Sequence, residues 1–202
     1  VAPSGRLATT FPLRWEDLPS SRGFPGKTLL GPDPTARGIL AGVDRRAEVR
    51  YDEGLAVGYR HDAPVAYPFG FGLSYTRFSH SAPRVDRDAG DDALRVTVEV
   101  KNIGLTAGRE VVQLYVAPPR GAGVRELRAF AKTPLLAPGQ SATVELRLAP
   151  RDLASFDEAR RAWVVPAGAH TVAVGASARD ILGEARVDFA RERVLEKVSA
   201  SP

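Results

Sequence analysis

The sequence contains no cysteine and no methionine. Without cysteine the chain cannot form a disulfide framework or a thiolate metal site, but this does not indicate a compartment, because a β-sandwich of this size can fold without bridges. No apolar run approaches the roughly 18 residues that a membrane-spanning helix needs. A translated reading frame begins with methionine, whereas this chain begins Val-Ala-Pro-Ser. We therefore expect a C-terminal piece of a longer protein, whose localisation is unknown because a signal peptide would precede it.

Lysine is scarce as well, with only four residues against 24 arginines and a formal net charge of +4. The basic residues are interspersed with acids, as where Arg160-Arg161 directly follows Asp157-Glu158. A protein that follows a nucleic-acid backbone carries a basic stripe instead. The composition therefore predicts a solvated surface of mixed charge, with neither a nucleic acid nor a membrane as partner.

Residues 1–66 show no sustained helical or strand periodicity. The segment is rich in glycine and proline, and only Ala8–Leu13 and Glu48–Tyr51 have a strand-like pattern. Its apolar area is too small for a core of its own, so we expect it to lie against a larger body. The side chains that would anchor it there are Phe11, Leu13, Trp15, Leu18 and Phe24.

The character of the sequence changes at residues 67–78, where five of twelve residues are aromatic. Pro68, Gly70 and Gly72 exclude a regular helix and disfavour a long strand. So many rings indicate a buried segment, and glycine lets the backbone turn or approach another surface between them. We predict an irregular, ordered and buried hinge, with Tyr75 among its packed residues.

From Phe78 onward the sequence has the period-two pattern of β-strands. Residues 94–101 alternate apolar with polar side chains, which is typical of a strand with one buried face. Over residues 109–117 both faces are largely apolar. We predict that this second strand is central, that Tyr115 belongs to the core, and that its second face contacts the upstream extension.

Further short strands recur at the spacing of a sandwich. They are predicted at 78–85, 126–132, 142–148, 162–165, 170–175 and 185–190. The count of seven or eight favours an immunoglobulin-like or fibronectin type III-like β-sandwich. We expect Trp163 to be buried against Val112, Leu114 and Val116. We also expect one helical turn over 151–156, with Asp152 as its cap, and a short tail helix over 191–198.

Several of these segments also resemble a known family. Residues 51–60 and 67–78 are similar to the hinge near the C-terminus of family 3 glycoside hydrolases, the β-glucosidase and β-xylosidase group, and residues 3–12 are similar to the end of the second domain of that family. The resemblance continues in the same order through 111–116, 126–132, 136–139, 151–153, 163–165 and 177–181. It covers nearly the whole chain as far as residue 193.

The resemblance implies a mainly β chain. Residues 1–66 would be the end of an α/β second domain with its extension, 67–78 the hinge, 79–193 a fibronectin type III-like sandwich, and 194–202 a tail. The chain would be the C-terminal segment of a retaining β-glycosidase, foremost a β-glucosidase, that hydrolyses terminal β-linked sugars of oligosaccharides or aryl glycosides. Its partners would be the catalytic domains that precede it, and its own role that of a stabilising scaffold.

A second interpretation is a free-standing carbohydrate-binding or adhesion module of the same fold. Residues 1–66 disfavour it, because a free module has no use for a segment rich in glycine and proline that cannot bury itself.

No residue of this sequence is predicted to be catalytic. Retaining glycosidases need two carboxyl groups about 5 Å apart. Asp52 and Glu53 are adjacent, so their side chains diverge in an extended segment, and nothing near them, Asp44 or Asp62 indicates a pocket. In the family that this chain resembles, the nucleophile and the acid/base residue precede the part present here. We therefore expect this chain alone to be inactive.

The remaining candidates for functional residues are the histidines and the aromatic residues of the hinge. His61, His80 and His170 lack the spacing of a metal site, so we predict neither a metal nor a cofactor. Tyr67, Phe69 and Phe71 could line a substrate cleft by stacking on sugar rings, but buried aromatics between glycines more often pack, and we favour an interdomain plug. Arg60 is interpreted as a hinge residue bonded to a carboxylate or a carbonyl.

Overall fold

The computed structural model describes residues 2–24, 26–28, 47–88, 90, 92–119 and 124–199. Their contacts divide the chain into two compact units. One unit comprises the residues up to Thr9 together with those from Pro68 onward, and the other is Thr10–Tyr67. The first residues of the chain therefore belong to the larger unit, although they are separated from it in the sequence by the whole of the smaller one.

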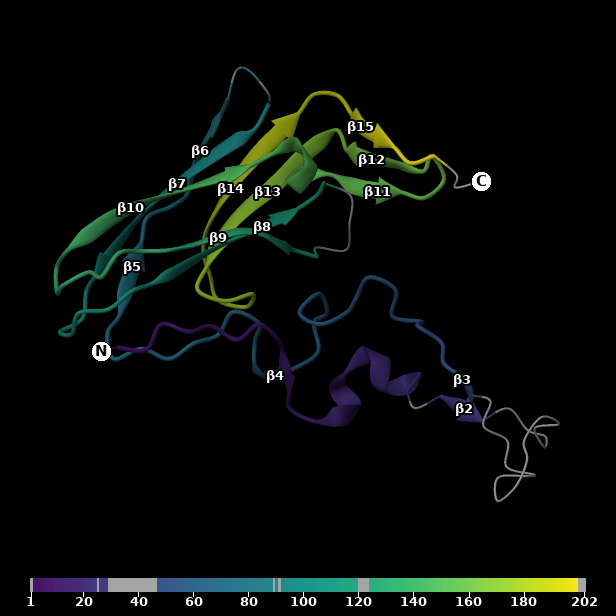
Figure 1. The fold of residues 1–202 in the computed structure, drawn as a ribbon, viewed down its shortest axis with the longest axis horizontal. Coiled ribbons are helices and arrows are strands. Elements are labelled where there is room, and N and C mark those ends of the chain that lie inside the picture. Colours follow the sequence, from purple (N-terminus) through teal and green to yellow (C-terminus); the bar gives the residue numbers. More distant parts are fainter. Residues whose placement is uncertain are drawn as a thin grey trace. The chain divides into compact units, whose positions relative to one another are not determined.

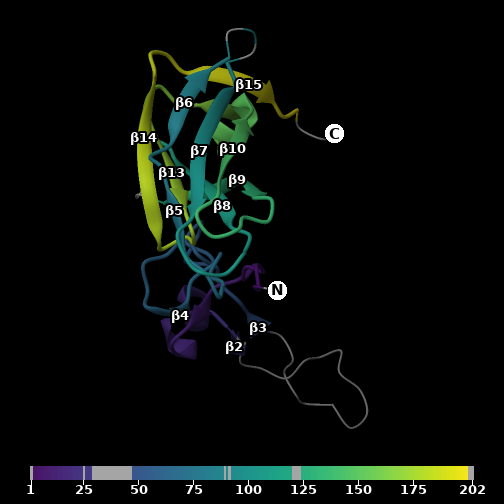
Figure 2. The same ribbon diagram turned by 90° about the vertical axis from the view of Figure 1, so that its left-hand side faces the viewer.

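The larger unit is a sandwich of antiparallel sheets (Figures 1 and 2). One sheet has the order β10 (Ser141–Leu148), β7 (Leu94–Asn102) and β5 (Phe78–His80), with β6 (Arg84–Arg87) also paired to β7. The other has the order β14 (Ile181–Phe189), β13 (Gly168–Gly175), β8 (Val111–Ala117) and β9 (Glu126–Lys132). A small third sheet consists of β11 (Ser155–Asp157), β12 (Ala162–Val165) and β15 (Arg193–Lys197). The mainly β sandwich predicted from the sequence is confirmed.

The core lies between the two large sheets and follows the predicted alternation. The inward side chains of β7 are fully buried, as are Leu114 and Val112 on β8. Side chains from β10 and β13 complete this layer. Because successive residues of a strand point to opposite faces, the polar residues between these positions reach solvent on β7 and β10.

Strand β8 is the central strand that the sequence predicted. It pairs with β13 on one side and with β9 on the other. Its outer face is buried too, since Gln113 is 3% and Tyr115 0% exposed. Residues 4–8 and 69–70 line a cavity together with this outer face. The predicted contact with the upstream part of the chain is thus made by the first few residues.

The end of the chain differs from the expectation. Residues 193–197 form strand β15, which pairs with β12, so the predicted tail helix is wrong. Pairing with an exposed strand edge satisfies backbone groups that a short isolated helix in water would hold only weakly. The helical turn before β11 is a 3₁₀ turn, η4 (Pro150–Leu153), and Asp152 accepts a hydrogen bond from the Ala149 amide at 2.8 Å as its predicted cap.

Trp163 is half-buried, whereas the sequence predicted full burial. It lies on β12, in the small third sheet, and packs at the edge of the core. Its ring contacts Phe156 at 5.3 Å between centroids, and the guanidinium of Arg151 lies 3.7 Å from its ring centre. The indole is therefore held partly by a cation–π contact at the surface.

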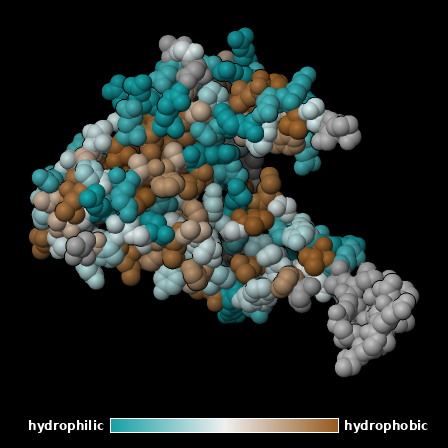
Figure 3. Space-filling model, viewed as in Figure 1, coloured by the Kyte–Doolittle hydropathy of each residue, from teal (hydrophilic) through white to brown (hydrophobic). Residues whose placement is uncertain are grey.

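The smaller unit has little core, as its composition predicted. It contains β1 (Phe11–Pro12) paired with β4 (Val65–Tyr67), β2 (Lys27–Thr28) paired with β3 (Ala47–Glu48), and the 3₁₀ turns η1 (Trp15–Asp17) and η2 (Pro19–Arg22). Among its described residues only His61 is buried. Four of the expected anchors are exposed, namely Phe11, Leu13, Trp15 and Phe24. Figure 3 shows apolar residues at the surface among polar ones.

Candidate functional site

The hinge is tied to the first residues of the chain by backbone hydrogen bonds. The Leu7 amide donates to the Phe71 carbonyl at 2.8 Å, and the Gly70 amide donates to the Leu7 carbonyl at 2.8 Å. On the other side, the Ala178 amide donates to the Phe69 carbonyl at 2.9 Å. The hinge backbone is therefore held between the start of the chain and the loop that follows β13.

Gly70 occupies a position that favours glycine. Its φ is +82°, and a Cβ atom there would overlap the side-chain amide of Gln113. Left-handed backbone is strained for other residues, so both the conformation and the close approach select glycine at this point.

Gln113 connects the hinge to the sandwich. Its Nε2 donates to the carbonyl of Gly70 at 3.1 Å and to that of Ala176 at 2.7 Å, while its Oε1 accepts from the Tyr115 hydroxyl at 2.7 Å. Gln113 and Tyr115 are both buried, so water does not reach their polar groups, and these hydrogen bonds satisfy them instead. Tyr115 is thus a core residue, as predicted from the sequence.

A buried ion pair joins the start of the chain to the same sheet. One guanidinium nitrogen of Arg6 lies 2.7 and 2.8 Å from the two carboxylate oxygens of Glu110. The side chains are 13% and 5% exposed, respectively. Removing one partner of such a pair is costly, because the other charge is then left shielded from water without a counter-charge.

The ion pair also affects a nearby histidine on β5. Burial lowers the pKa of His80; the Glu110 and Asp180 carboxylates raise it in opposition, while Arg6 lowers it further. Burial likewise lowers the pKa of His170, whose ring packs edge-on against Phe189 at 5.0 Å.

These two histidines predict a loss of stability in acid. Their folded-state pKa values lie below the unfolded value, so the unfolded chain takes up protons first, and the stability present above about pH 6.5 is lost as the pH falls through the folded pKa. Each histidine can contribute at most about 1.4 kcal/mol per pH unit. Chemical denaturation between about pH 7.5 and pH 5.5 should show the decline, and a variant with His80→Gln and His170→Gln should show a smaller slope. An unchanged slope would contradict this assignment.

The predicted substrate-lining aromatics lie in different settings. Phe69 and Phe71 are half-buried in the larger unit, and Phe69 lines a cavity of about 300 Å³ with Gln113 and Phe130. Tyr67 belongs to the smaller unit, is 49% exposed, and meets Phe11 edge-to-face at 6.4 Å. The substrate-lining role of these three residues stays a prediction.

Tyr75 corrects the expectation of a wholly buried hinge. It is 74% exposed, and Leu73 beside it is 70% exposed. Between them and β5, Thr76 is buried and donates to Asn102 at 2.6 Å. The hinge segment therefore contains both buried and exposed residues. Arg60, in the smaller unit, is half-buried with its guanidinium 5.6 Å from the Tyr59 ring centre.

The acidic residues of the smaller unit do line a pocket, contrary to the expectation. Asp52 and Glu53 border a cavity of about 390 Å³ together with Glu16 and Asp17. None of the four side chains is buried, and Asp17 accepts a hydrogen bond from the Arg14 amide at 3.0 Å. The general acid of a glycosidase usually lies in an apolar enclosure, whereas these four carboxylates are exposed or half-exposed. Asp44 lies outside the described residues.

Among the described residues, no group of three or more His, Asp or Glu side chains is placed to hold a metal ion. No described helix is long and apolar enough to cross a bilayer.

Sequence reasoning missed Arg6, Glu110 and the bridging role of Gln113. A polar residue in the middle of an otherwise apolar strand was the available signal for Gln113, because a buried amide needs partners. Arg6 and Glu110 gave no local signal, since their contact joins residues 104 positions apart.

Comparison with known proteins agrees with this architecture. A fibronectin type III-like domain matches residues 110–178, which run from the start of β8 past the end of β13. The chain is 43% identical to a β-glucosidase of Rhizobium radiobacter, in a match that covers 97% of this chain and 23% of that protein. It is 37% identical to β-glucosidase B of Emericella nidulans, in a match that covers 93% of this chain and 22% of that protein. This chain is a relative of the β-glucosidases.

Solved structures extend the same relationship. The chain superposes on β-glucosidase 3B of Thermotoga neapolitana with a TM-score of 0.81 and 40% identity, covering 97% of this chain and 26% of that one. It matches the glycoside hydrolase family 3 β-glucosidase of Bifidobacterium adolescentis with a TM-score of 0.78 and 36% identity, covering 100% of this chain and 28% of that one. The chain thus spans about a quarter of the length of such relatives.

Proposed function

We propose that this chain is the C-terminal segment of a retaining β-glucosidase that hydrolyses terminal β-linked sugars, and that the segment is a scaffold without catalytic residues. The similarity to β-glucosidases over nearly the whole chain supports the first part. The hinge supports the second, because its backbone is hydrogen-bonded to Leu7, Gln113 and Ala178 within the sandwich unit.

The attachment of residues 2–9 to the sandwich is the observation that carries this proposal. These residues lie at the start of the chain, where the family resemblance places the end of an α/β domain. Arg6 and Leu7 fix them to β8 and the hinge through a buried ion pair and backbone hydrogen bonds. A sandwich secured in this way would hold the end of the preceding domain at a defined position, and the domains of that same chain would be its partners.

We expect the chain alone to have no glycosidase activity. Catalysis needs a rigidly held pair of carboxyl groups, and the carboxylates around Asp52 and Glu53 lack an enclosing shell. Purified chain incubated with an aryl β-glucoside should therefore release no more product than buffer. Turnover that disappears on Asp52→Ala or Glu53→Ala would overturn the scaffold assignment, whereas turnover that survives both changes would identify a contaminating enzyme.

A second experiment tests the scaffold role itself. Arg6→Ala in the longer parent protein should lower its thermal stability and leave the KM for the aryl glucoside unchanged until the protein unfolds, because the residue holds domains together and does not touch the sugar. A raised KM in fully folded protein would instead show that the hinge shapes the substrate site.

A further inference from the structure

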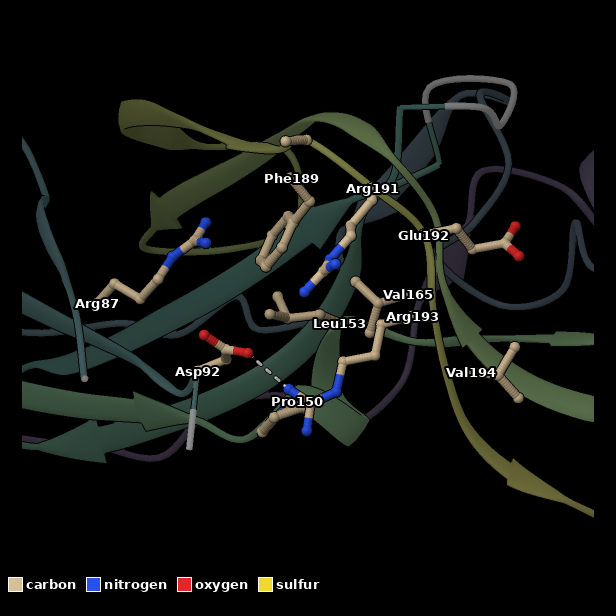
Figure 4. Close-up of a pocket in the computed structure, with 11 residues that line it drawn as sticks. Arg87, Asp92, Pro150, Leu153, Val165, Phe189, Arg191, Glu192, Arg193 and Val194 are labelled. Atoms are coloured by element: carbon tan, nitrogen blue, oxygen red, sulfur yellow. Dashed lines mark hydrogen bonds and ion pairs between the residues drawn. The ribbon is translucent and has the colours of Figure 1, made fainter. Parts of the chain in front are cut away.

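A cavity of about 650 Å³ opens at one end of the sandwich, where β6, η4, β12, β14 and the start of β15 meet. Figure 4 shows the side chains that line it. Its volume lies within the range of roughly 300–1,000 Å³ that is typical of small-molecule sites. No residue of this cavity took part in the structural bonds of the hinge.

The apolar part of the cavity is rigid. Leu153 and Val165 are 3% and 2% exposed and belong to the core cluster. Phe189 packs against the same cluster, and its ring is held edge-on by His170 at 5.0 Å. Leu153 and Val165 expose little area themselves, so the half-buried Phe189 supplies most of the apolar surface that a ligand would meet, on a base that the core holds in place.

Both acidic residues that line the cavity are already neutralised. Asp92 pairs with Arg193 at 2.8 Å, the contact drawn in Figure 4. The two oxygens of Glu192 accept hydrogen bonds from Arg160 at 2.5 and 3.0 Å. Asp92 and Glu192 are thus each paired with an arginine other than Arg191, and Arg160 also pairs with Asp157.

Two other guanidinium groups lie at the cavity. Arg87 donates to the Asp188 carbonyl at 3.0 Å and lies 4.5 Å from the Phe189 ring centre. Arg191 is exposed, and in Figure 4 its guanidinium points inward, beside Phe189 and towards Leu153. Within the described residues Arg191 makes no hydrogen bond or ion pair. Neither guanidinium is paired with a carboxylate among the described residues, and of the two only Arg191 is also without a hydrogen bond.

We propose that this cavity binds a monocarboxylate whose body is a ring with an apolar face, the chemistry shared by hexuronate sugars and aromatic carboxylates. Arg191 receives the carboxylate through its planar fork of donors, and the ring lies against Phe189, above the base formed by Leu153 and Val165. The two oxygens of a carboxylate match the planar fork of Arg191 in a bidentate contact, which favours a carboxylate as the anion. The inference concerns the sandwich alone and does not depend on the proposed function.

Calorimetric titration of the 202-residue chain tests the proposal with four probes. Sodium glucuronate and phenylacetate carry both the ring and the carboxylate, glucose carries the ring without the charge, and acetate carries the charge without the ring. We expect at least one of the first two to bind with a Kd of about 1 mM, and glucose and acetate to bind about tenfold more weakly or worse. The stronger of the first two identifies the source of the carboxylate.

Matched variants assign the effect to the cavity. Arg191→Gln should weaken binding about tenfold, because it removes the charge and most of the donors from an exposed side chain without disturbing the core. Arg186→Gln, which changes an exposed arginine on β14 outside the cavity, should leave the affinity unchanged. Raising the salt concentration should weaken binding to the unmodified chain.

Three results would overturn the proposal. They are equal affinity for glucose and glucuronate, equal weakening by the two substitutions, or no heat of binding for either ring carboxylate at about 10 mM, where a millimolar site would be nearly filled.

Discussion

Replacing Arg6 by alanine is expected to lower the free energy of unfolding by about 3–5 kcal/mol. The substitution leaves Glu110 buried, with its side chain only 5% exposed, and without its cation. It also removes a side-chain contact of residues 2–9, which are then held to the hinge by the backbone bonds of Leu7 with Gly70 and Phe71. Urea unfolding followed by far-UV circular dichroism measures the change.

A double-mutant cycle distinguishes a buried charge from general damage. Adding Glu110→Ala to Arg6→Ala should restore part of the loss, because an absent pair costs less than one unpaired buried charge. Arg125→Ala provides the matched control. Its contact with Glu184 has the same length of 2.7 Å, but both side chains are at least 40% exposed. We expect that variant to lose less than about 1 kcal/mol, and an equally small loss for Arg6→Ala would contradict our assignment.

Gly70→Ala should destabilise the chain by about 3 kcal/mol or more, for two reasons. A left-handed residue with a Cβ costs about 1–2 kcal/mol by itself. In addition, the new methyl group would displace the Gln113 side chain from two carbonyls and from the Tyr115 hydroxyl, each loss costing about 1 kcal/mol or more at a buried site.

Gly139→Ala separates these two contributions. Gly139 has a φ of +78°, close to the +82° of Gly70, but a Cβ there would meet nothing within 4 Å. This variant should therefore show only the backbone cost of about 1–2 kcal/mol. If the two alanine variants lose the same stability, the contact between Gly70 and Gln113 contributes nothing, and the hinge is not held by the side chain of β8.

Local sequence patterns determined most of the strands. The alternation over residues 94–101 placed β7 and its buried face, because in a strand the side-chain direction reverses at every residue. Residues 126–132 and 162–165 were predicted with their observed bounds, since turn residues flank them on both sides. The doubly apolar pattern of 111–116 identified β8 as central and Tyr115 as core.

The sequence was less informative where a residue's environment depends on a distant partner. Strand β15 was mistaken for a helix because a short amphipathic segment suits either state, and the edge of β12 decided between them. Tyr75 and Trp163 carry aromatic rings that suggest burial, but a ring also suits a surface position, and only packing settles which it takes.

The sequence by itself determined that this chain is a β-sandwich with an upstream segment that lacks a core, because periodicity and apolar content are local properties. The tertiary structure decided what joins the first residues of the chain to the sandwich and where ligands can enter. The pair Arg6–Glu110 spans 104 positions, and the cavity at Arg191 gathers residues from 87 to 194. Such contacts follow from how sheets pair and stack, and that information is distributed over the whole chain.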